Sequence, residues 1–231
     1  MACQLSPAWQ RKAVSSDRLA KISARFLSDT PKTGQGADTC RAIPFLLDNP
    51  ELVWVAHDLC GILAERGHGS MLYHLREPSE DGQYHHLVET LHSQAGSCEF
   101  CLLPTTSAET VLAHAFDHVV LLVPANLDAV LRAYHRIKVL AQQNTPEIGV
   151  VLVGPRDQHA AWRFFRKLAV GTLRYLDVPL LNLGFLPEQV TPEHAAHDHH
   201  RNNFLTRISE RLLRSKFYST LPDRKAVREN V

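Results

Sequence analysis

The stretch Asp117–Pro124, DHVVLLVP, decides the fold of this 231-residue chain. It is a continuous aliphatic run, which a strand needs when helices cover both faces of a parallel sheet. The next residues, Asn126–Gln142, space their apolar side chains along one side of an amphipathic helix. A second aliphatic run, Ile148–Val153, follows after a short connection. Strand, helix and strand in this order predict an α/β fold, a three-layer sandwich with a mostly parallel, doubly covered sheet.

The same alternation continues on both sides of this unit. Towards the C-terminus it predicts a helix at Asp157–Leu168, a strand at Leu180–Phe185 and a last helix at Asn203–Phe217. Towards the N-terminus it predicts strands at Glu51–Ala56, Ser70–Leu75 and Phe100–Leu103, and helices at His57–Gly67 and Tyr84–His92. We therefore expect one α/β domain at 41–217, between a flexible N-terminal arm at 1–40 and a loose C-terminal tail at 218–231.

The composition narrows the function classes. The formal net charge is +1, so no strong field favours nucleic acid or a membrane as the main partner. The aliphatic runs are much shorter than the roughly 20 residues that span a bilayer, and the N-terminus lacks the apolar region of a signal peptide. Five cysteines form an odd set without a disulfide framework. Reduced thiols and a cytoplasmic location are therefore expected.

Four blocks of sequence resemble the MinD/ParA family of P-loop ATPases, and the FlhG branch most closely, across 50–215. Residues 57–75, HDLCGILAERGHGSMLYHL, resemble the family's first helix and second strand, and 98–106, CEFCLLPTT, resemble the strand that ends in its switch aspartate. Residues 116–140 and 148–188 are similar to the strands and helices that close its sheet. The resemblance implies the family's three-layer fold.

The chain departs from this family where the chemistry takes place. No G-x-x-x-x-G-K-[ST] phosphate loop occurs, and the expected strand-to-helix junction at Ala56 and His57 leaves no room for one. The resemblance implies that the family's acidic residue after the second strand falls near Arg76. It implies that the switch aspartate falls at Pro104 and that Gly154 replaces the base-reading asparagine. Phosphoryl transfer relies on such groups for positioning and charge neutralisation. We therefore expect a pseudo-ATPase, not an enzyme, with no cofactor.

The resemblance implies a regulatory or scaffolding role through protein contacts. Its implied partners are a flagellar-type GTPase or an active MinD-like ATPase, and it implies recruitment to a cell pole or to the inner membrane surface. Within the N-terminal arm, Ser15–Leu27 predicts a short helix that presents Leu19, Ile22 and Phe26 on one side. A short helix on a tether is a common recognition mode, so these three residues are the predicted partner-binding residues.

Two clusters of ligand-type residues have both functional and structural interpretations. Cys98 and Cys101 form a C-x-x-C, typical of a redox pair or half a zinc site. In a strand, positions three apart point to opposite faces, so structural thiols are favoured. His194, His197, His199 and His200 are weak candidate metal ligands. A solvated connection before the last helix is favoured over a metal site there.

Two alternative functions remain. An enzyme or ligand-binding protein could use polar groups at the carboxyl ends of the strands, although their spacing selects no reaction. These groups are His57, Asp58, Arg76, Thr105, Thr106, Asn126, Arg156 and Asp157. For Asp58 and Asp128 the favoured role is at the positive end of a helix. The last helix, 203–217, also has the basic and apolar sides of a membrane-surface helix, but packing on the sheet is favoured.

Overall fold

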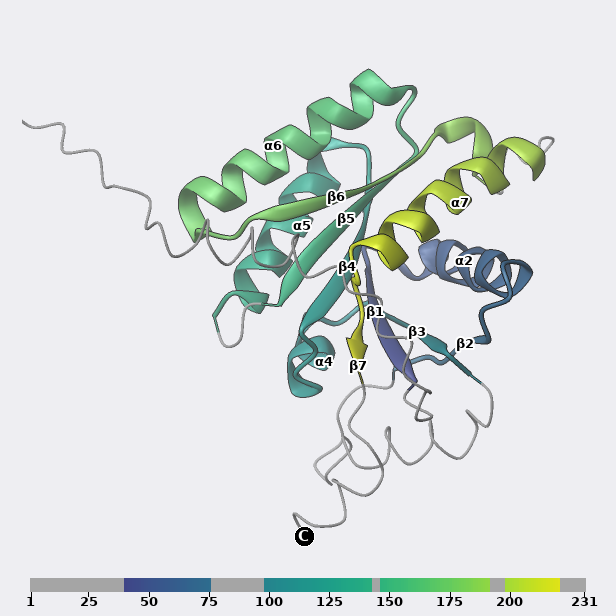
Figure 1. Cartoon of the computed structure of the whole chain (residues 1–231). Helices are drawn as coiled ribbons and strands as arrows, with labels where there is room; N and C mark the ends of the chain where they lie inside the picture. The colour runs from purple at the N-terminus through teal and green to yellow at the C-terminus, as the bar shows by residue number, and fades with distance from the viewer. Residues whose placement is uncertain (1–39, 76–97, 143–145, 192–197, 221–231) are drawn as a thin grey trace, which may run out of the picture. The chain divides into compact units, whose positions relative to one another are not determined.

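The computed structural model describes residues 40–75, 98–142, 146–191 and 198–220. Its sheet has the strand order β2-β3-β1-β4-β5-β6, and every neighbouring pair in this order is parallel (Figure 1). A short β7 pairs antiparallel with β1. The strands are β1 (Arg41–Leu47), β2 (Ser70–Leu72), β3 (Phe100–Thr105), β4 (His118–Pro124), β5 (Glu147–Val153), β6 (Leu180–Leu186) and β7 (Ser219–Thr220).

Helices cover both faces of this sheet, as predicted. Helices α4, α5 and α6 pack on one face, and α2 and α7 pack on the other (Figure 1). Alternate residues of β1 enter the two cores: Ala42 and Leu46 face the first, whereas Ile43 and Phe45 face the second. The helical segments are η1 (Pro50–Leu52), α2 (Val53–Glu65), α4 (Ala108–Ala113), α5 (Leu127–Leu140), α6 (Gln158–Leu176), η2 (Glu188–Val190) and α7 (Asp198–Arg214).

The centre of the sheet forms where the aliphatic runs predicted it. β4 pairs with β5 along its whole length, from His118 opposite Glu147 to Pro124 opposite Val153. All residues between the ends of β4 are buried. Because both faces of this strand are covered, its sequence is aliphatic throughout rather than alternating.

The predicted strand at Glu51–Ala56 is wrong. These residues form η1 and the first turn of α2. Among the described residues the first strand is β1, which begins ten residues earlier in the chain. Pro50 stands at the start of the helical segment, where the missing N–H costs nothing. The apolar residues that follow recur with helical spacing and are buried on one side, at Leu52, Val55, Ala56, Leu59 and Ile62.

Other boundaries differ from the predictions by less. α6 continues past the predicted Leu168 to Leu176, and α7 begins at Asp198 instead of Asn203. β7 lies within the predicted C-terminal tail and extends the sheet beside β1. The predicted helix Tyr84–His92 lies outside the described residues. Among the helices that the structure describes, none combines the length and the apolar composition needed to cross a membrane.

Candidate functional site

Open parallel sheets bind ligands at the edge formed by the carboxyl ends of the strands, where the chain continues into the helices. In this structure the β1–α2 connection, residues 48–52, is the connection that would carry a phosphate loop. Its sequence is DNPEL and contains no glycine and no lysine. The connections after β3, β4 and β5 lie at the same edge. These four connections therefore form the candidate site.

The β1–α2 connection is tied to α5 by two arginines. Arg132 forms a fork with the carboxylate of Asp48: its Nε donates to Oδ1 at 2.9 Å and its Nη2 donates to Oδ2 at 2.7 Å. Such a two-point pair fixes orientation as well as distance. The Asp48 side chain is only 5% exposed, and its hydrogen bonds raise the pKa of Arg132. We call Asp48, Arg132 and Arg136 the arginine clamp.

Arg136 holds the backbone of the same connection. Its Nη1 donates to the carbonyl oxygen of Leu47 at 2.5 Å, and its Nη2 donates to that of Asp48 at 3.1 Å. Nη1 also lies 3.8 Å from Asp48 Oδ1. Burial lowers the pKa of Arg136, but a guanidinium keeps its charge at any ordinary pH. The end of β1 is therefore fixed by a cation that belongs to the protein itself.

The chemistry of this connection does not fit a nucleotide phosphate. A phosphate loop needs several backbone N–H groups that converge on one anion. Here Pro50 has no N–H, and the N–H of Leu52 is donated to the carbonyl oxygen of Asn49 at 3.2 Å. Glu51 adds a negative charge in the same turn. The buried Oδ1 of Asn49 has no partner among the described residues, and it is an acceptor rather than a donor.

The polar side chains at the other three connections cap helices. Ser107 Oγ accepts from the N–H of Thr110 at 3.1 Å, and Asn126 Oδ1 accepts from the N–H of Ala129 at 2.8 Å. Asp157 Oδ1 accepts the N–H of the third residue of α6 at 2.7 Å. These bonds satisfy helix donors that would otherwise be orphaned. Ser107, Asn126 and Asp157 therefore have a structural role as helix caps.

His57 and Asp58 lie side by side on α2. Their side chains approach to 3.4 Å, and His57 is 78% exposed. The expected capping role of Asp58 is wrong, because α2 begins at Val53 and Asp58 lies in its second turn. Asp58 instead forms an ion pair with Arg201 of α7, whose guanidinium lies 4.4 Å from the ring of Trp54. These contacts join α2 to α7.

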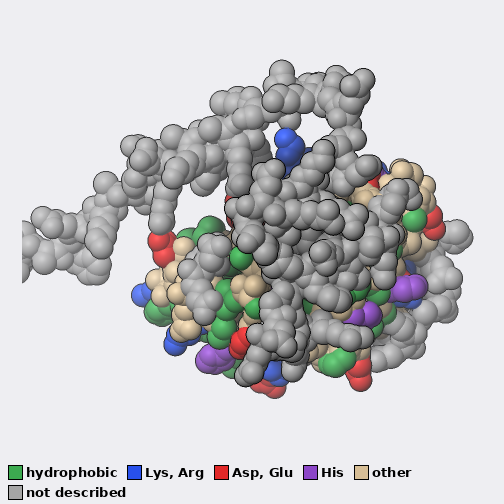
Figure 2. All heavy atoms as spheres, turned by 90° about the horizontal axis from the view of Figure 1, so that it is seen from below, with side chains coloured by type: hydrophobic (Ala, Val, Ile, Leu, Met, Phe, Trp, Pro, Cys, Tyr) green, Lys and Arg blue, Asp and Glu red, His purple; other side chains and the backbone are tan. Residues whose placement is uncertain are grey.

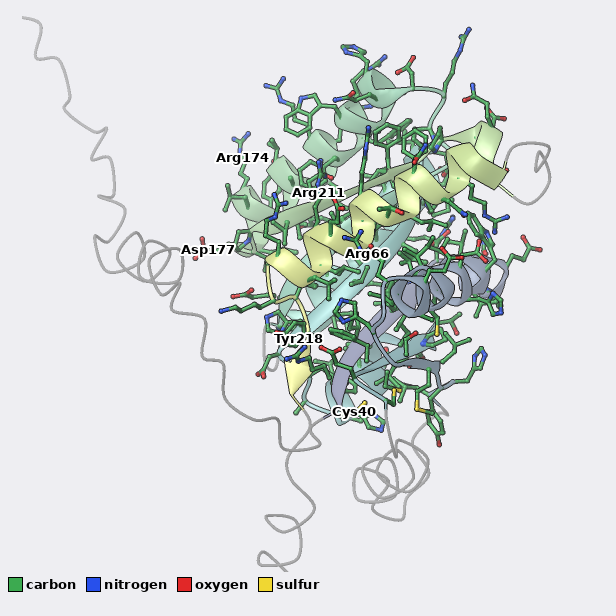
Figure 3. All side chains as sticks on the ribbon, turned by 45° about the vertical axis from the view of Figure 1, so that its right-hand side comes forward. Cys40, Arg66, Arg174, Asp177, Arg211 and Tyr218 are labelled. Carbon is green, nitrogen blue, oxygen red and sulfur yellow. The ribbon has the colours of Figure 1, made fainter. Side chains whose placement is uncertain are left out.

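Three cysteines form a thiol cluster at the opposite end of the sheet. Cys40 precedes β1, as the label in Figure 3 shows, and Cys98 precedes β3. Cys98 packs on the same core cluster as Cys40 and Cys101, so the predicted divergence of the two C-x-x-C sulfurs is wrong. Strand alternation does not apply to Cys98, because β3 starts only at Phe100.

Two thiols of the cluster, those of Cys40 and Cys98, are held in the neutral form. The pKa of Cys40 is raised to about 12, chiefly by its hydrogen bond with Cys101 and further by burial. The pKa of Cys98 is also raised, by its hydrogen bond with Cys40 and by burial. All three are free thiols. No group of three or more potential ligands that could hold a metal occurs among the described residues.

The remaining predicted site residues divide into two groups. Pro104 is buried within β3, Thr105 Oγ1 accepts from the N–H of Ser107 at 3.2 Å, and Gly154 follows β5 with a φ of +78°. Thr106 and Arg156 are exposed. The others are not described: Leu19, Ile22, Phe26, Arg76, His194 and His197 lie outside the described residues, and His199 and His200 lie in α7 with undescribed side chains.

Charge is mixed on the face seen in Figure 2, where the described basic and acidic side chains are interspersed. The arginine clamp was missed from the sequence because Asp48 lies more than 80 residues from Arg132 and Arg136. One signal was available. Arg132 and Arg136 are four residues apart, so they share one side of a helix, and an aspartate directly follows a strand.

Comparison with solved structures assigns the fold. The structure is similar to the MinD cell division protein of Aquifex aeolicus, with a TM-score of 0.54 and 12% identity over 79% of this chain and 99% of that chain. A MinC:MinD cell division protein complex from the same organism gives 0.53 and 12% over 80% and 99%. A ParA family ATPase from Chlorobium tepidum TLS gives 0.49 and 10% over 78% and 96%.

No protein-family model and no curated protein matches the sequence. At 12% identity the likeness to the MinD structures concerns the fold alone. The chain therefore has a P-loop NTPase fold of the MinD/ParA type, as the sequence predicted.

Proposed function

We propose that this chain is a non-catalytic regulatory or scaffolding protein, a degenerate FlhG-like form of the MinD/ParA fold that acts through protein contacts. The observation that carries the proposal is the β1–α2 connection. At the position where the fold presents backbone donors to a phosphate, this chain has a proline, an acidic residue and an aspartate already paired with two arginines. This chemistry argues against a bound triphosphate.

The wider setting of the proposal is a process in which FlhG-like proteins take part. We propose a cytoplasmic protein in flagellar, surface-appendage or polar positioning, recruited by a partner such as a flagellar-type GTPase or an active MinD-like ATPase. The N-terminal segment with Leu19, Ile22 and Phe26 supports this, since apolar residues at helical spacing are the usual anchors of a docking helix.

A nucleotide titration tests the non-catalytic role. The full chain is titrated with ATP and with ADP, each with Mg²⁺, by calorimetry up to millimolar nucleotide, and phosphate release is measured in parallel. We expect no saturable heat and a release rate equal to the protein-free blank. Micromolar affinity for ATP, or turnover above the blank, would contradict the proposal. An active ATPase of this fold serves as the positive control.

A capture experiment tests the docking segment. The full chain and a variant with Leu19, Ile22 and Phe26 replaced by alanine are compared as baits for a purified flagellar-type GTPase and for an active MinD-like ATPase. The matched control carries Asp17→Ser and Lys21→Ser, on the opposite side of the predicted helix. We expect capture to be lost only in the alanine variant. Equal capture by all three baits would show that the segment is not the docking site.

A further inference from the structure

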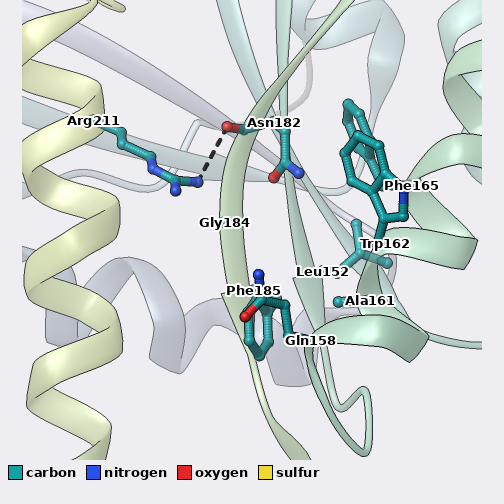
Figure 4. Close-up of a pocket in the computed structure, with 9 residues that line it drawn as sticks. All are labelled: Leu152, Gln158, Ala161, Trp162, Phe165, Asn182, Gly184, Phe185 and Arg211. Carbon is teal, nitrogen blue, oxygen red and sulfur yellow. Dashed lines mark hydrogen bonds between the residues drawn. The ribbon is translucent and has the colours of Figure 1, made fainter.

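A hollow of about 130 Å³ lies along β6, between α6 and α7 (Figure 4). Trp162 and Phe165 of α6 line one side, and Arg211 of α7 lines the other. Asn182 and Phe185 of β6 form part of its wall. The hollow contains none of the residues of the carboxyl-edge connections or of the arginine clamp.

The strand in this hollow is the edge of the sheet. β6 is the last strand in the sheet order, and its pairing with β5 shifts register between Val150 and Val151. The carbonyl oxygen of Asn182 accepts from Nη1 of Arg211 at 3.4 Å, so this backbone group points away from β5 (Figure 4). The outer side of a last strand is a template for one more strand.

The helices beside this edge are basic. The 19-residue α6 carries Arg163, Arg166, Lys167 and Arg174, all exposed, and contains no acidic residue. Arg207, Arg211 and Arg214 are exposed on α7. Figure 3 shows Arg174 and Arg211 on the two helices that flank β6.

The same edge also exposes large apolar side chains. Trp162 and Leu173 are 53% and 55% exposed, and Leu181 of β6 is 41% exposed. Trp162, Phe165 and Leu173 follow one another with helical spacing, so they share the flank of α6 that borders the hollow. Apolar side chains beside an open strand and a basic border are the features that an extended acidic segment would use.

We propose that this groove binds an extended, acidic segment of a partner protein, which pairs with β6 as an added strand. Its carboxylates meet the arginines of α6 and α7, and its apolar side chains pack on Trp162 and Leu173. The inference rests on the proposed function in one respect, which is that the proposed function includes a protein partner. A second copy of the chain is a poor occupant, because two basic borders repel each other.

A peptide titration tests the groove. The probe is a fluorescein-labelled ten-residue peptide that alternates glutamate with valine, measured by anisotropy with the full chain. We expect saturable binding that weakens as salt rises. Hydrogen exchange of the backbone amides at 180–186 should slow in the complex. A peptide with lysine in place of glutamate, and one with N-methylated backbone groups, should bind at least about tenfold more weakly, since each lacks one of the two interactions.

Two charge-reversal variants localise the binding. Arg166→Glu reverses an exposed charge on the groove-side flank of α6, and Lys138→Glu reverses an exposed charge on α5. We expect the first to raise the Kd by about fivefold or more and the second to leave it nearly unchanged, given the energies of exposed ion pairs. Circular dichroism checks that both variants are folded.

Several outcomes would overturn the inference. These are no saturable binding, equal binding of the N-methylated peptide, equal effects of the two variants, or tighter binding of a single-stranded 20-mer DNA than of the acidic peptide. Dimerisation that is lost in Arg166→Glu would assign the groove to a second copy instead. If the acidic peptide does not bind and the chain binds no nucleotide, the groove inference fails but the proposed function is not contradicted. Nucleotide binding and turnover would refute that function whatever the peptide does.

Discussion

Replacement of Arg136 by alanine tests whether the arginine clamp organises the β1–α2 connection. Arg136 makes two hydrogen bonds to the carbonyl oxygens of Leu47 and Asp48. A hydrogen bond that involves a charged group contributes about 1.5–3 kcal/mol. The Arg136 side chain is 24% exposed, so water reaches part of the vacated space and recovers some of this free energy. We expect Arg136→Ala to lower the free energy of unfolding by about 2–3 kcal/mol.

The measurement is urea unfolding followed by circular dichroism. For a domain of this size the urea dependence is about 2 kcal/mol per molar, so the midpoint should fall by about 1–1.5 M. Lys138→Ala is the matched control, since it removes an exposed cation of the same helix without touching the clamp. Its midpoint should fall by less than half as much. Equal shifts in the two variants would refute the reasoning that Arg136 holds the strand end.

Three further predictions concern the core and the backbone. Folding raises the pKa of Cys40 to about 12, so this thiol ionises at a lower pH in the unfolded chain than in the folded chain. The free energy of unfolding should therefore decline between about pH 9 and pH 12. Urea unfolding should show a less steep decline in Cys40→Ala. Gly149→Ala places its Cβ 2.4 Å from Cδ1 of Leu183 and should lower the unfolding free energy by about 1–3 kcal/mol in the same assay. Ala115 has a φ of +48°, which glycine adopts without strain. Ala115→Gly should therefore raise the free energy of unfolding by about 0.5–1 kcal/mol and raise the thermal midpoint.

Each of these predictions has a distinct control. For the thiol, the curves of both proteins should coincide below pH 8, and identical slopes above pH 9 would contradict it. For the core, Gly61→Ala is the matched control, because Gly61 is an exposed position of α2 and an added Cβ there meets nothing within 4 Å. That change should stabilise by about 0.5–1 kcal/mol. A lower thermal midpoint in Ala115→Gly would show that the positive φ carries no strain.

The sequence predicted the middle of the fold well and its start poorly. β4, α5 and β5 were found because an aliphatic run, a helical period and a second aliphatic run follow one another with little interruption. β1 was missed because Pro44 lies within it, and a proline argues against a central strand. All residues of β1 but one are buried, as in any central strand, although its sequence contains a proline.

The clamp shows why the site was harder to predict than the fold. Periodicity finds elements because it depends on neighbours in the sequence, whereas Asp48 meets Arg132 only after β1 and β4 have paired. The residues alone show that the chain has no phosphate-loop motif. They do not show which connection occupies the position of that loop. The sequence predicted this connection at the Ala56–His57 junction, whereas in the structure it follows β1 and comprises Asp48–Leu52.

The clamp also explains how such a fold can keep its β1–α2 connection ordered without a ligand. In a phosphate loop the anion is a ligand, so its stabilising effect depends on nucleotide concentration. Here the anion is the side chain of Asp48 and its cations belong to α5, so the pair forms in every folded molecule. Under the proposed function, the chain should therefore bind its protein partner equally well with ATP, with ADP and with neither nucleotide.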